Sequence, residues 1–187
     1  MIWKTLKIWF HKLGSAPYFY RFARVVSPWL WVGFAISAVY GLYLALYVVP
    51  PDYQQGDSAR ILYIHVPAAW QAMFIYGVMA ILAAIALIWR IRLTEILAMS
   101  CAPIGAALTL VCLATGSLWG KPMWGTWWEW DARLTSMLVL LFIYIGIMGL
   151  YAAFDDKRKG ARVASVLVLA GVVNIPIIHF SVEWWNT

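Results

Sequence analysis

Five long apolar runs constrain this chain more than any other feature of its sequence. A helix needs about 20 consecutive apolar residues to cross the hydrocarbon core of a bilayer. The runs cover residues 28–49, 66–89, 96–118, 134–154 and 163–178. The last of them is short and needs its flanking residues to span. We therefore predict an all-α polytopic transmembrane helical bundle with five spans, forming a single multi-pass membrane domain over residues 1–187.

The composition excludes several other classes of protein. Hydrophobic residues make up 64% of the chain and charged residues 12%, whereas a soluble domain averages about half apolar and about a quarter charged. The net charge of +6 does not indicate nucleic-acid binding, because the basic residues lie between the apolar runs. The runs contain no ionisable Asp, Glu, Lys, Arg or His, which counts against a solute permease. The two cysteines, Cys101 and Cys112, are interpreted as buried structural thiols.

The distribution of Lys and Arg predicts the orientation of the bundle, because cytoplasmic loops carry an excess of these residues. Eleven of them lie on one side: Lys4, Lys7, Lys12, Arg21, Arg24, Arg90, Arg92, Lys157, Arg158, Lys159 and Arg162. The other side carries three, which are Arg60, Lys121 and Arg133. We therefore place the N-terminus in the cytoplasm and the C-terminal end of the fifth span outside.

Residues 1–27 are predicted to form a cytoplasmic amphipathic N-terminal segment. Within residues 1–13, apolar side chains recur at helical spacing and basic side chains lie opposite them. That pattern is typical of a helix lying on the membrane surface. A docking helix for a cytoplasmic subunit is the alternative.

A tryptophan-rich segment at residues 119–133 carries the most informative pattern. It holds five of the thirteen tryptophans: Trp119, Trp124, Trp127, Trp128 and Trp130. An interfacial aromatic belt does not need so many in one loop. Trp124, Trp127, Trp128 and Asp131 are spaced i, i+3, i+4 and i+7, so they would share one face of a short surface helix. We predict an amphipathic segment whose flat aromatic platform suits a broad, planar, apolar ligand such as a porphyrin.

Two histidines are expected at the same depth as this segment. His65 immediately precedes the second span, with Pro67 suited to the first helical turn, and His179 immediately follows the fifth. Each alone is more often an interfacial hydrogen-bonding residue, but haem iron takes imidazole as an axial ligand. The shared side and depth favour a pair of ligands. The outer cations are either partners for haem propionates or ordinary loop charges.

Residues 124–131 read WGTWWEWD and match the WGxWWxWD signature of a haem-handling family. With their continuation at 132–136, and with residues 65–69 and 177–185, the chain resembles the haem exporter protein C (CcmC) family of bacterial cytochrome c maturation. The resemblance covers essentially the whole chain. It implies six spans and a cytoplasmic C-terminal tail, one span more than the five predicted here.

The resemblance implies that haem b is held on the periplasmic side of the bacterial inner membrane and presented to the haem chaperone CcmE for covalent attachment. Other implied partners are the membrane subunits CcmB and CcmD and the ATP-binding subunit CcmA. His65 and His179 carry over as the axial ligands of the iron. The other expected haem-binding residues are Trp119, Trp124, Gly125, Trp127, Trp128, Trp130, Asp131 and Arg133.

The sequence carries no catalytic motif that would make the chain an enzyme. Residues 116–122 faintly resemble a phosphate-binding loop, but the spacing is one residue short and Pro122 replaces the required Ser or Thr. We therefore expect a haem-binding and transfer protein without ATPase activity. The alternative is a structural membrane subunit of an ABC-type transporter complex that has no haem site of its own.

Overall fold

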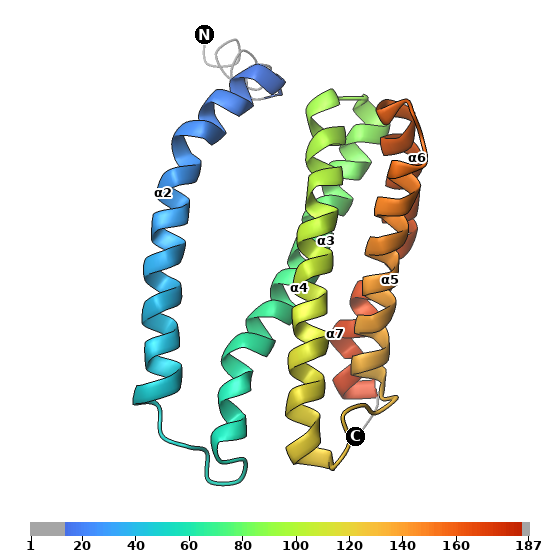
Figure 1. The fold of residues 1–187 in the computed structure, drawn as a ribbon. Helices are drawn as coiled ribbons and strands as arrows, with labels where there is room; N and C mark the ends of the chain where they lie inside the picture. The colour runs from blue at the N-terminus through green and yellow to red at the C-terminus, as the bar shows by residue number, and fades with distance from the viewer. Residues whose placement is uncertain (1–13, 185–187) are drawn as a thin grey trace. The chain divides into compact units, whose positions relative to one another are not determined.

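The computed structural model describes residues 14–184, and this part of the chain is helical without a β-strand (Figure 1). The helices are α2 (Ala16–Tyr43), α3 (Leu62–Trp89), α4 (Arg92–Trp124), α5 (Ala132–Ala152), α6 (Lys157–Gly171) and α7 (Asn174–Trp184), with the short helices η1 (Leu44–Val48) and η2 (Asp57–Ile61). The amphipathic helix predicted within residues 1–13 lies outside the described residues.

Five helical segments are long and apolar enough to cross a membrane, which confirms the predicted number of spans. They are Ala16–Val48, Asp57–Trp89, Arg92–Trp124, Ala132–Ala152 and Lys157–Ser181. Most of them extend beyond the apolar runs, since helix ends follow backbone capping as well as hydropathy. The chain is therefore a multi-pass membrane protein.

The chain divides into two compact units, and α2 belongs to the first, which comprises Met1–Pro50 with Ile91–Leu93. The helix begins after Ser15, with a proline in its first turn, and runs through Pro28 without interruption. Residues 16–27 are therefore continuous with the first span. None of the residues of α2 is buried.

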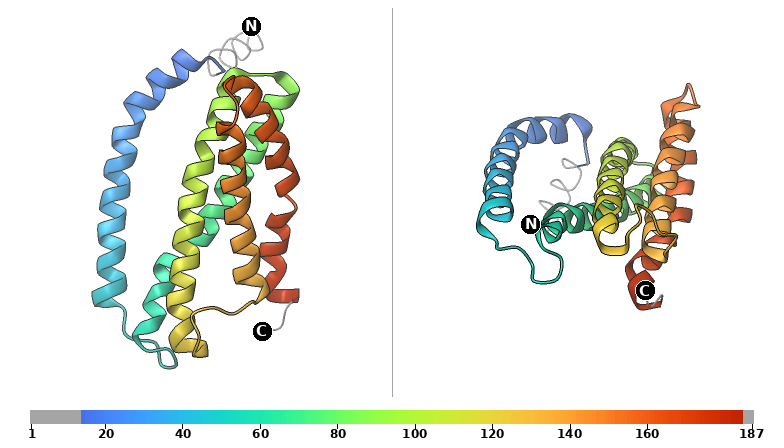
Figure 2. Two further views of the ribbon diagram at one scale, coloured as in Figure 1. Left: turned by 45° about the vertical axis from the view of Figure 1, so that its right-hand side comes forward. Right: turned by 60° about the horizontal axis from the view of Figure 1, so that its bottom comes forward.

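The second unit, Pro51–Arg90 with Thr94–Thr187, contains the helices that carry the candidate site. Figures 1 and 2 show that the start of α3, the end of α4, the start of α5 and all of α7 lie at one end of this unit. The end of α3, the start of α4 and the start of α6 lie at the other. The first set includes the tryptophan-rich segment and both histidines.

Two buried tyrosines join the helices of the second unit. The hydroxyl of Tyr76 in α3 donates to the carbonyl of Val168 in α6 over 2.8 Å, and the hydroxyl of Tyr144 in α5 donates to the carbonyl of Ala72 over 2.9 Å. Their rings meet edge to face, with centroids 5.3 Å apart. Each hydroxyl also lies against a glycine, where an added Cβ would overlap the tyrosine, at Gly171 and Gly105 respectively.

The fifth span is a broken helix, because α6 ends at Gly171 and α7 begins at Asn174. Pro176 has no N–H to donate to the carbonyl four residues before it, and that carbonyl, of Val172, instead accepts from the N–H of Ile175 at 3.0 Å. The buried Asn174 side chain donates to the carbonyl of Ser136 in α5 over 3.0 Å. Polar groups at the break therefore find hydrogen-bond partners within the bundle, as the apolar interior of a bilayer requires.

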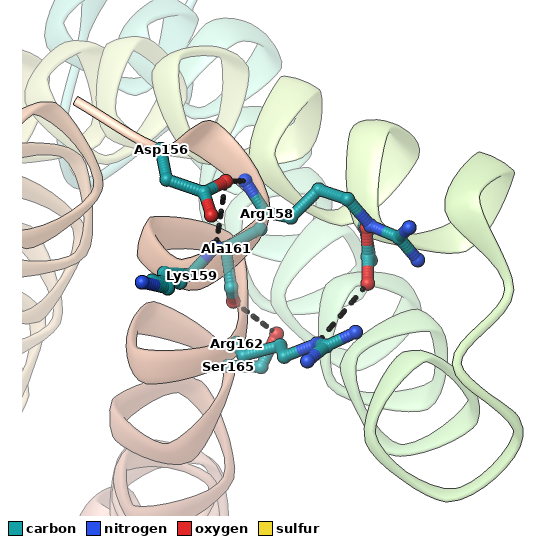
Figure 3. Close-up of polar contacts among 7 residues, drawn as sticks. Asp156, Arg158, Lys159, Ala161, Arg162 and Ser165 are labelled. Carbon is teal, nitrogen blue, oxygen red and sulfur yellow. Dashed lines mark hydrogen bonds and ion pairs between the residues drawn. The ribbon is translucent and has the colours of Figure 1, made fainter. Parts of the chain in front are cut away.

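A buried carboxylate links α4 to α6 at the end of the unit opposite the histidines. Figure 3 shows Arg158 and Arg162 of α6, which this carboxylate contacts. Glu95 is 1% exposed, and its two oxygens lie 3.3 Å from Arg158 Nε and 3.5 Å from Arg162 Nε. The sequence analysis missed this group, because the apolar run begins one residue later. The arginine side chains are 47% and 41% exposed, so the cluster lies at the boundary of the bundle.

Asp156 begins α6 at the same end of the unit. Its carboxylate accepts from the backbone N–H groups of Arg158 and Lys159, at 2.9 and 3.4 Å, which caps the helix (Figure 3). These backbone hydrogen bonds lower the pKa of the exposed Asp156 carboxyl, because they stabilise its charged form. The capping side chain therefore stays ionised at neutral pH and fixes the start of the basic turn.

Replacing Glu95 with Gln should destabilise the protein, because it leaves two arginine charges facing a neutral group. Breaking a fully buried pair costs roughly 3–5 kcal/mol, and the half-exposed arginines reduce the expected loss in unfolding free energy to about 1–2 kcal/mol. Thermal unfolding in detergent micelles measures this, with Glu129→Gln as the exposed-carboxylate control. Equal midpoints for the two variants would show that the Glu95 ion pairs contribute nothing to stability.

Candidate functional site

Both histidines line one cavity of about 260 Å³ in the second unit. Its walls come from α3, α4, α5 and α7 and are mostly apolar. The lining residues are His65, Val66, Ala69, Trp70, Met73, Cys112, Leu113, Arg133, Leu134, Met137, Ile178, His179 and Ser181. We call this space the histidine cavity. Both cysteines are free thiols, as predicted. Cys112 is buried in the wall of this cavity, and Cys101 is half-buried elsewhere in α4.

His65 lies inside α3, so the prediction that it precedes the helix is wrong. The helical segment begins earlier, at Asp57, with the turn η2, in which Arg60 Nε and the Asp57 carboxylate form an ion pair at 2.9 Å. His65 therefore sits in the first turn of α3, and Pro67 follows in the next turn.

The ring of His65 is held against α4. Its Nδ1 lies 3.0 Å from the carbonyl oxygen of Cys112 and 3.1 Å from the hydroxyl of Thr115. The indole of Trp119 meets the imidazole at an angle of 62°, with centroids 5.8 Å apart, and its Nε1 donates to Gln55 Oε1 over 3.1 Å. Trp119 therefore contacts a histidine of the cavity without lining the cavity itself.

His179 has a different environment. It lies within α7 and not beyond the last helix as predicted, because the broken fifth span resumes at Asn174 and continues past it. Its imidazole is exposed and meets two aromatic rings edge-on, with centroid distances of 4.9 Å to Phe180 and 6.3 Å to Trp70. The site thus combines one ring fixed by hydrogen bonds and one ring that meets two aromatic side chains edge-on.

The tryptophan-rich segment does not form the predicted amphipathic helix. Trp124 is the last residue of α4, residues 125–131 are not helical, and α5 begins at Ala132. Gly125 has a φ of +76°, and its N–H donates to the carbonyl of Lys121 over 3.1 Å. A glycine in this left-handed conformation is a common helix end. The helical spacing therefore crosses a helix terminus, and the tryptophans do not share one face.

The tryptophans of the segment have separate environments. The guanidinium of Arg133 lies 5.7 Å from the centroid of the Trp124 ring, and Lys121 Nζ lies 5.8 Å from the Trp127 ring. Trp128 packs against the core and meets Trp130 edge-on at 5.4 Å. Trp130 is 76% exposed. Cation–π pairs and one core contact thus replace a continuous platform.

Arg133 connects the histidine cavity to a second cavity of about 410 Å³, which is lined by Trp124, Glu129, Trp130, Asp131 and Arg133 itself. Asp131 accepts from Arg133 Nε and from the N–H of Leu134, both at 2.8 Å, so it caps α5 and holds the arginine. Arg60 and Lys121 line neither cavity; Lys121 Nζ donates to the Gly125 carbonyl. Of the three predicted outer cations, Arg133 is thus the one placed at both cavities.

The donor set of the histidine cavity is small. Within residues 14–184, no group of three or more His, Cys, Asp or Glu side chains is placed to hold a metal ion. Two imidazoles on an apolar cavity suit a metal whose other ligands come from its own ligand framework, as in a porphyrin. The arginine beside them provides donors for a carboxylate.

Comparison with known proteins gives consistent results. The family model "Heme exporter protein C" (CcmC) matches residues 9–187. "Heme exporter protein C" of Escherichia coli (strain K12) is 52% identical over 186 residues, which cover 100% of this chain and 74% of that protein. The Bradyrhizobium diazoefficiens protein of the same name is 51% identical over 175 residues, 94% of this chain and 66% of its own. A "Putative cytochrome c biosynthesis ccmC-like mitochondrial protein" of Marchantia polymorpha is 46% identical over 168 residues, 90% of this chain and 69% of its own.

Replacing Asp131 with Ala should lower the free energy of unfolding by about 1 kcal/mol, because α5 loses its N-cap. Asp131→Asn should retain most of the stability, since an asparagine side chain also caps helices. Thermal unfolding of the purified protein in detergent compares the two variants. An equal loss of unfolding free energy in Asp131→Asn and Asp131→Ala would show that the ion pair with Arg133, and not the helix cap, determines the effect.

Proposed function

Because the chain belongs to the haem exporter protein C (CcmC) family of cytochrome c biogenesis, we propose that it binds haem b at the periplasmic face of the bacterial inner membrane. We further propose that it presents this haem to the chaperone CcmE. The observation that carries the proposal is the position of His65 and His179, from α3 and α7, on one apolar cavity beside Arg133.

Haem ligation suits the chemistry of this cavity. A porphyrin supplies four equatorial nitrogens, and the protein adds one or two axial ligands, for which imidazole is common. The walls of the histidine cavity also include Met73, Leu134, Met137 and Ile178, which offer apolar contact to a macrocycle. His65 and His179 would hold the iron, and the apolar walls of the cavity would hold the macrocycle.

Arg133 is the proposed partner of a haem propionate. Its Nε is engaged by Asp131, and a guanidinium has five N–H donors in total, so its terminal nitrogens can still bind a carboxylate. Arg133 lines the histidine cavity and the second cavity, so it could hold a propionate of a haem bound by the two histidines. Asp131 fixes the arginine, so we propose that it acts on haem indirectly.

The proposed orientation places the histidine cavity on the outer side. The helix bounds put Arg60 just before α3, Lys121 at the end of α4 and Arg133 at the start of α5, which is the end of the second unit that holds the cavity. Arg90 follows the end of α3, and the basic residues within 157–162 begin α6, at the opposite end. The excess of basic residues at the end opposite the cavity supports a cytoplasmic location for that end. The exposed Trp127 and Trp130 would then face the periplasm, where CcmE approaches, and CcmA, CcmB and CcmD would complete the assembly.

His65→Ala and His179→Ala should each leave one axial position of the haem iron without its protein ligand. We expect haem retention to fall at least about tenfold, since even outer ligand contacts contribute 10–100-fold to metal affinity. Added imidazole should partly restore the visible spectrum. The measurement is haem per purified protein, with Tyr53→Ala as the control at an exposed position.

Wild-type occupancy and spectrum in both histidine variants would show that the axial assignment is wrong. A wild-type protein that shows no haem absorption band after purification or after titration with haem would favour the alternative, a structural subunit of a transporter complex without its own haem site.

Reporter fusions should establish the orientation independently of haem. A fusion after Lys159 should be active as a cytoplasmic reporter, and a fusion after Glu129 should be active as a periplasmic one, because the basic residues predict that order. Green fluorescent protein and alkaline phosphatase serve as the paired reporters. The opposite result would place the histidine cavity on the cytoplasmic side and contradict haem presentation to a periplasmic chaperone.

A further inference from the structure

Resting on the proposed haem function, we propose that α4 carries a cradle for His65, formed by the Cys112 carbonyl, the Thr115 hydroxyl, Gly116 and Trp119. The cradle fixes the imidazole so that Nε2 is the nitrogen available to haem iron. These are positioning residues, since they act on haem through His65.

The hydrogen bonds at Nδ1 determine which ring nitrogen carries the proton. The carbonyl of Cys112, 3.0 Å away, can only accept a hydrogen bond. The hydroxyl of Thr115 donates to the carbonyl of Val111 over 2.7 Å, so it turns a lone pair toward Nδ1 at 3.1 Å. The carbonyl and the hydroxyl therefore both favour Nδ1 as the donor, and the thiol of Cys112 is the more distant contact, with its Sγ 3.9 Å from Nδ1.

A neutral imidazole protonated at Nδ1 has its lone pair on Nε2. Among residues 14–184, Nε2 of His65 has no hydrogen-bond partner, and the ring lines the histidine cavity. Histidines that bind metals commonly donate their other N–H to a backbone carbonyl, which fixes the tautomer and the ring orientation. His65 has this arrangement.

Gly116 supplies the space in which the ring lies. A Cβ added there would be 3.1 Å from His65 Cε1 and 3.3 Å from Leu134 Cδ2. Contacts this close force one of the neighbours to move, and Leu134 is itself buried. An added methyl group would therefore displace the imidazole or the Leu134 side chain by a few tenths of an ångström.

The cradle residues follow a single stripe of α4, because positions 112, 115, 116 and 119 are spaced i, i+3, i+4 and i+7. Trp119 closes the stripe with its edge-on contact to the imidazole and is itself held by Gln55. The sequence analysis placed Trp119 among the haem-binding residues; in this proposal it supports the ligand instead. His179 has no comparable hydrogen bonds among the described residues, so the cradle is specific to His65.

The test compares two cradle variants with matched controls in the full chain, purified and titrated with haem. Gly116→Ala is paired with Gly77→Ala, where an added Cβ meets no atom within 4 Å. Thr115→Val is paired with Thr109→Val, which removes a hydroxyl with the same bond to the carbonyl four residues earlier in α4. The readouts are haem affinity, the visible spectrum and the reduction potential of the bound haem.

We expect Gly116→Ala to weaken haem affinity about 10–100-fold, as for other contacts that orient a ligand, and imidazole to restore its spectrum. Thr115→Val should lower haem affinity about tenfold and shift the reduction potential of the bound haem. Thr115→Ser should return the affinity and the potential to their wild-type values. If Thr115 acted in folding alone, Thr115→Val would lower protein yield but leave the reduction potential unchanged, and Thr115→Ser would have no shift in the potential to reverse.

Two outcomes separate this proposal from the proposed function. Wild-type affinity, spectrum and potential in both cradle variants, together with loss of haem in His65→Ala, would overturn the cradle and leave haem ligation intact. Wild-type haem binding in His65→Ala would overturn the ligation on which the cradle rests. If Gly116→Ala does not accumulate, the nearly isosteric Thr115→Val and its serine rescue decide the question.

Discussion

The pair of buried tyrosines is the interaction on which the rest of the second unit depends. In a bilayer, helices gain little from the hydrophobic effect and associate through close packing and hydrogen bonds. Tyr76 and Tyr144 provide both, because each ring lies against a glycine of a neighbouring helix and each hydroxyl donates to a backbone carbonyl. They fix α3 against α5 and α6. The first turn of α3, where His65 lies, is therefore placed by contacts in the middle of the bundle.

A second set of polar contacts extends this frame to the candidate site. The Asn174 side chain ties the start of α7 to α5 at Ser136, so the position of His179 follows from that of α5. Asp131 begins α5 and binds Arg133. The residue that caps α5 thus also positions the Arg133 charge, which lies at both cavities, and α5 forms one wall of the histidine cavity. Side chains that would be classed as structural determine where the proposed ligand groups converge.

The sequence predicted the features that depend on length and polarity and missed those that depend on backbone geometry. Five spans were readable because apolar length alone decides whether a helix can cross a bilayer. The convergence of His65 and His179 followed from the same count of spans. The break at Asn174 was not readable, because the residues around it remain apolar. Hydropathy does not report that Pro176 lacks an N–H.

The same limit explains the errors at the tryptophan-rich segment and at Glu95. Helical spacing from Trp124 to Asp131 suggested one amphipathic helix, but Gly125 adopts a positive φ and ends α4 inside that pattern. Gly125 belongs to the signature at residues 124–131, and a glycine there is a sequence signal for the end of a helix. Glu95 adjoins an apolar run and was counted outside it. Only the partner helix, with Arg158 and Arg162, shows why a carboxylate is buried there.

The two halves of the proposed site differ in a way that suits a protein that must release its ligand. His65 is held by hydrogen bonds to α4, and a ring that the protein holds in place loses little further entropy when it binds a ligand. His179 is exposed, lies beyond the break in the fifth span and meets the rings of Trp70 and Phe180 edge-on. Ordering that ring on ligation would reduce the net affinity. A site with two fixed imidazoles would hold haem more tightly and pass it on more slowly, so under the proposed function this difference would limit tight ligation to His65.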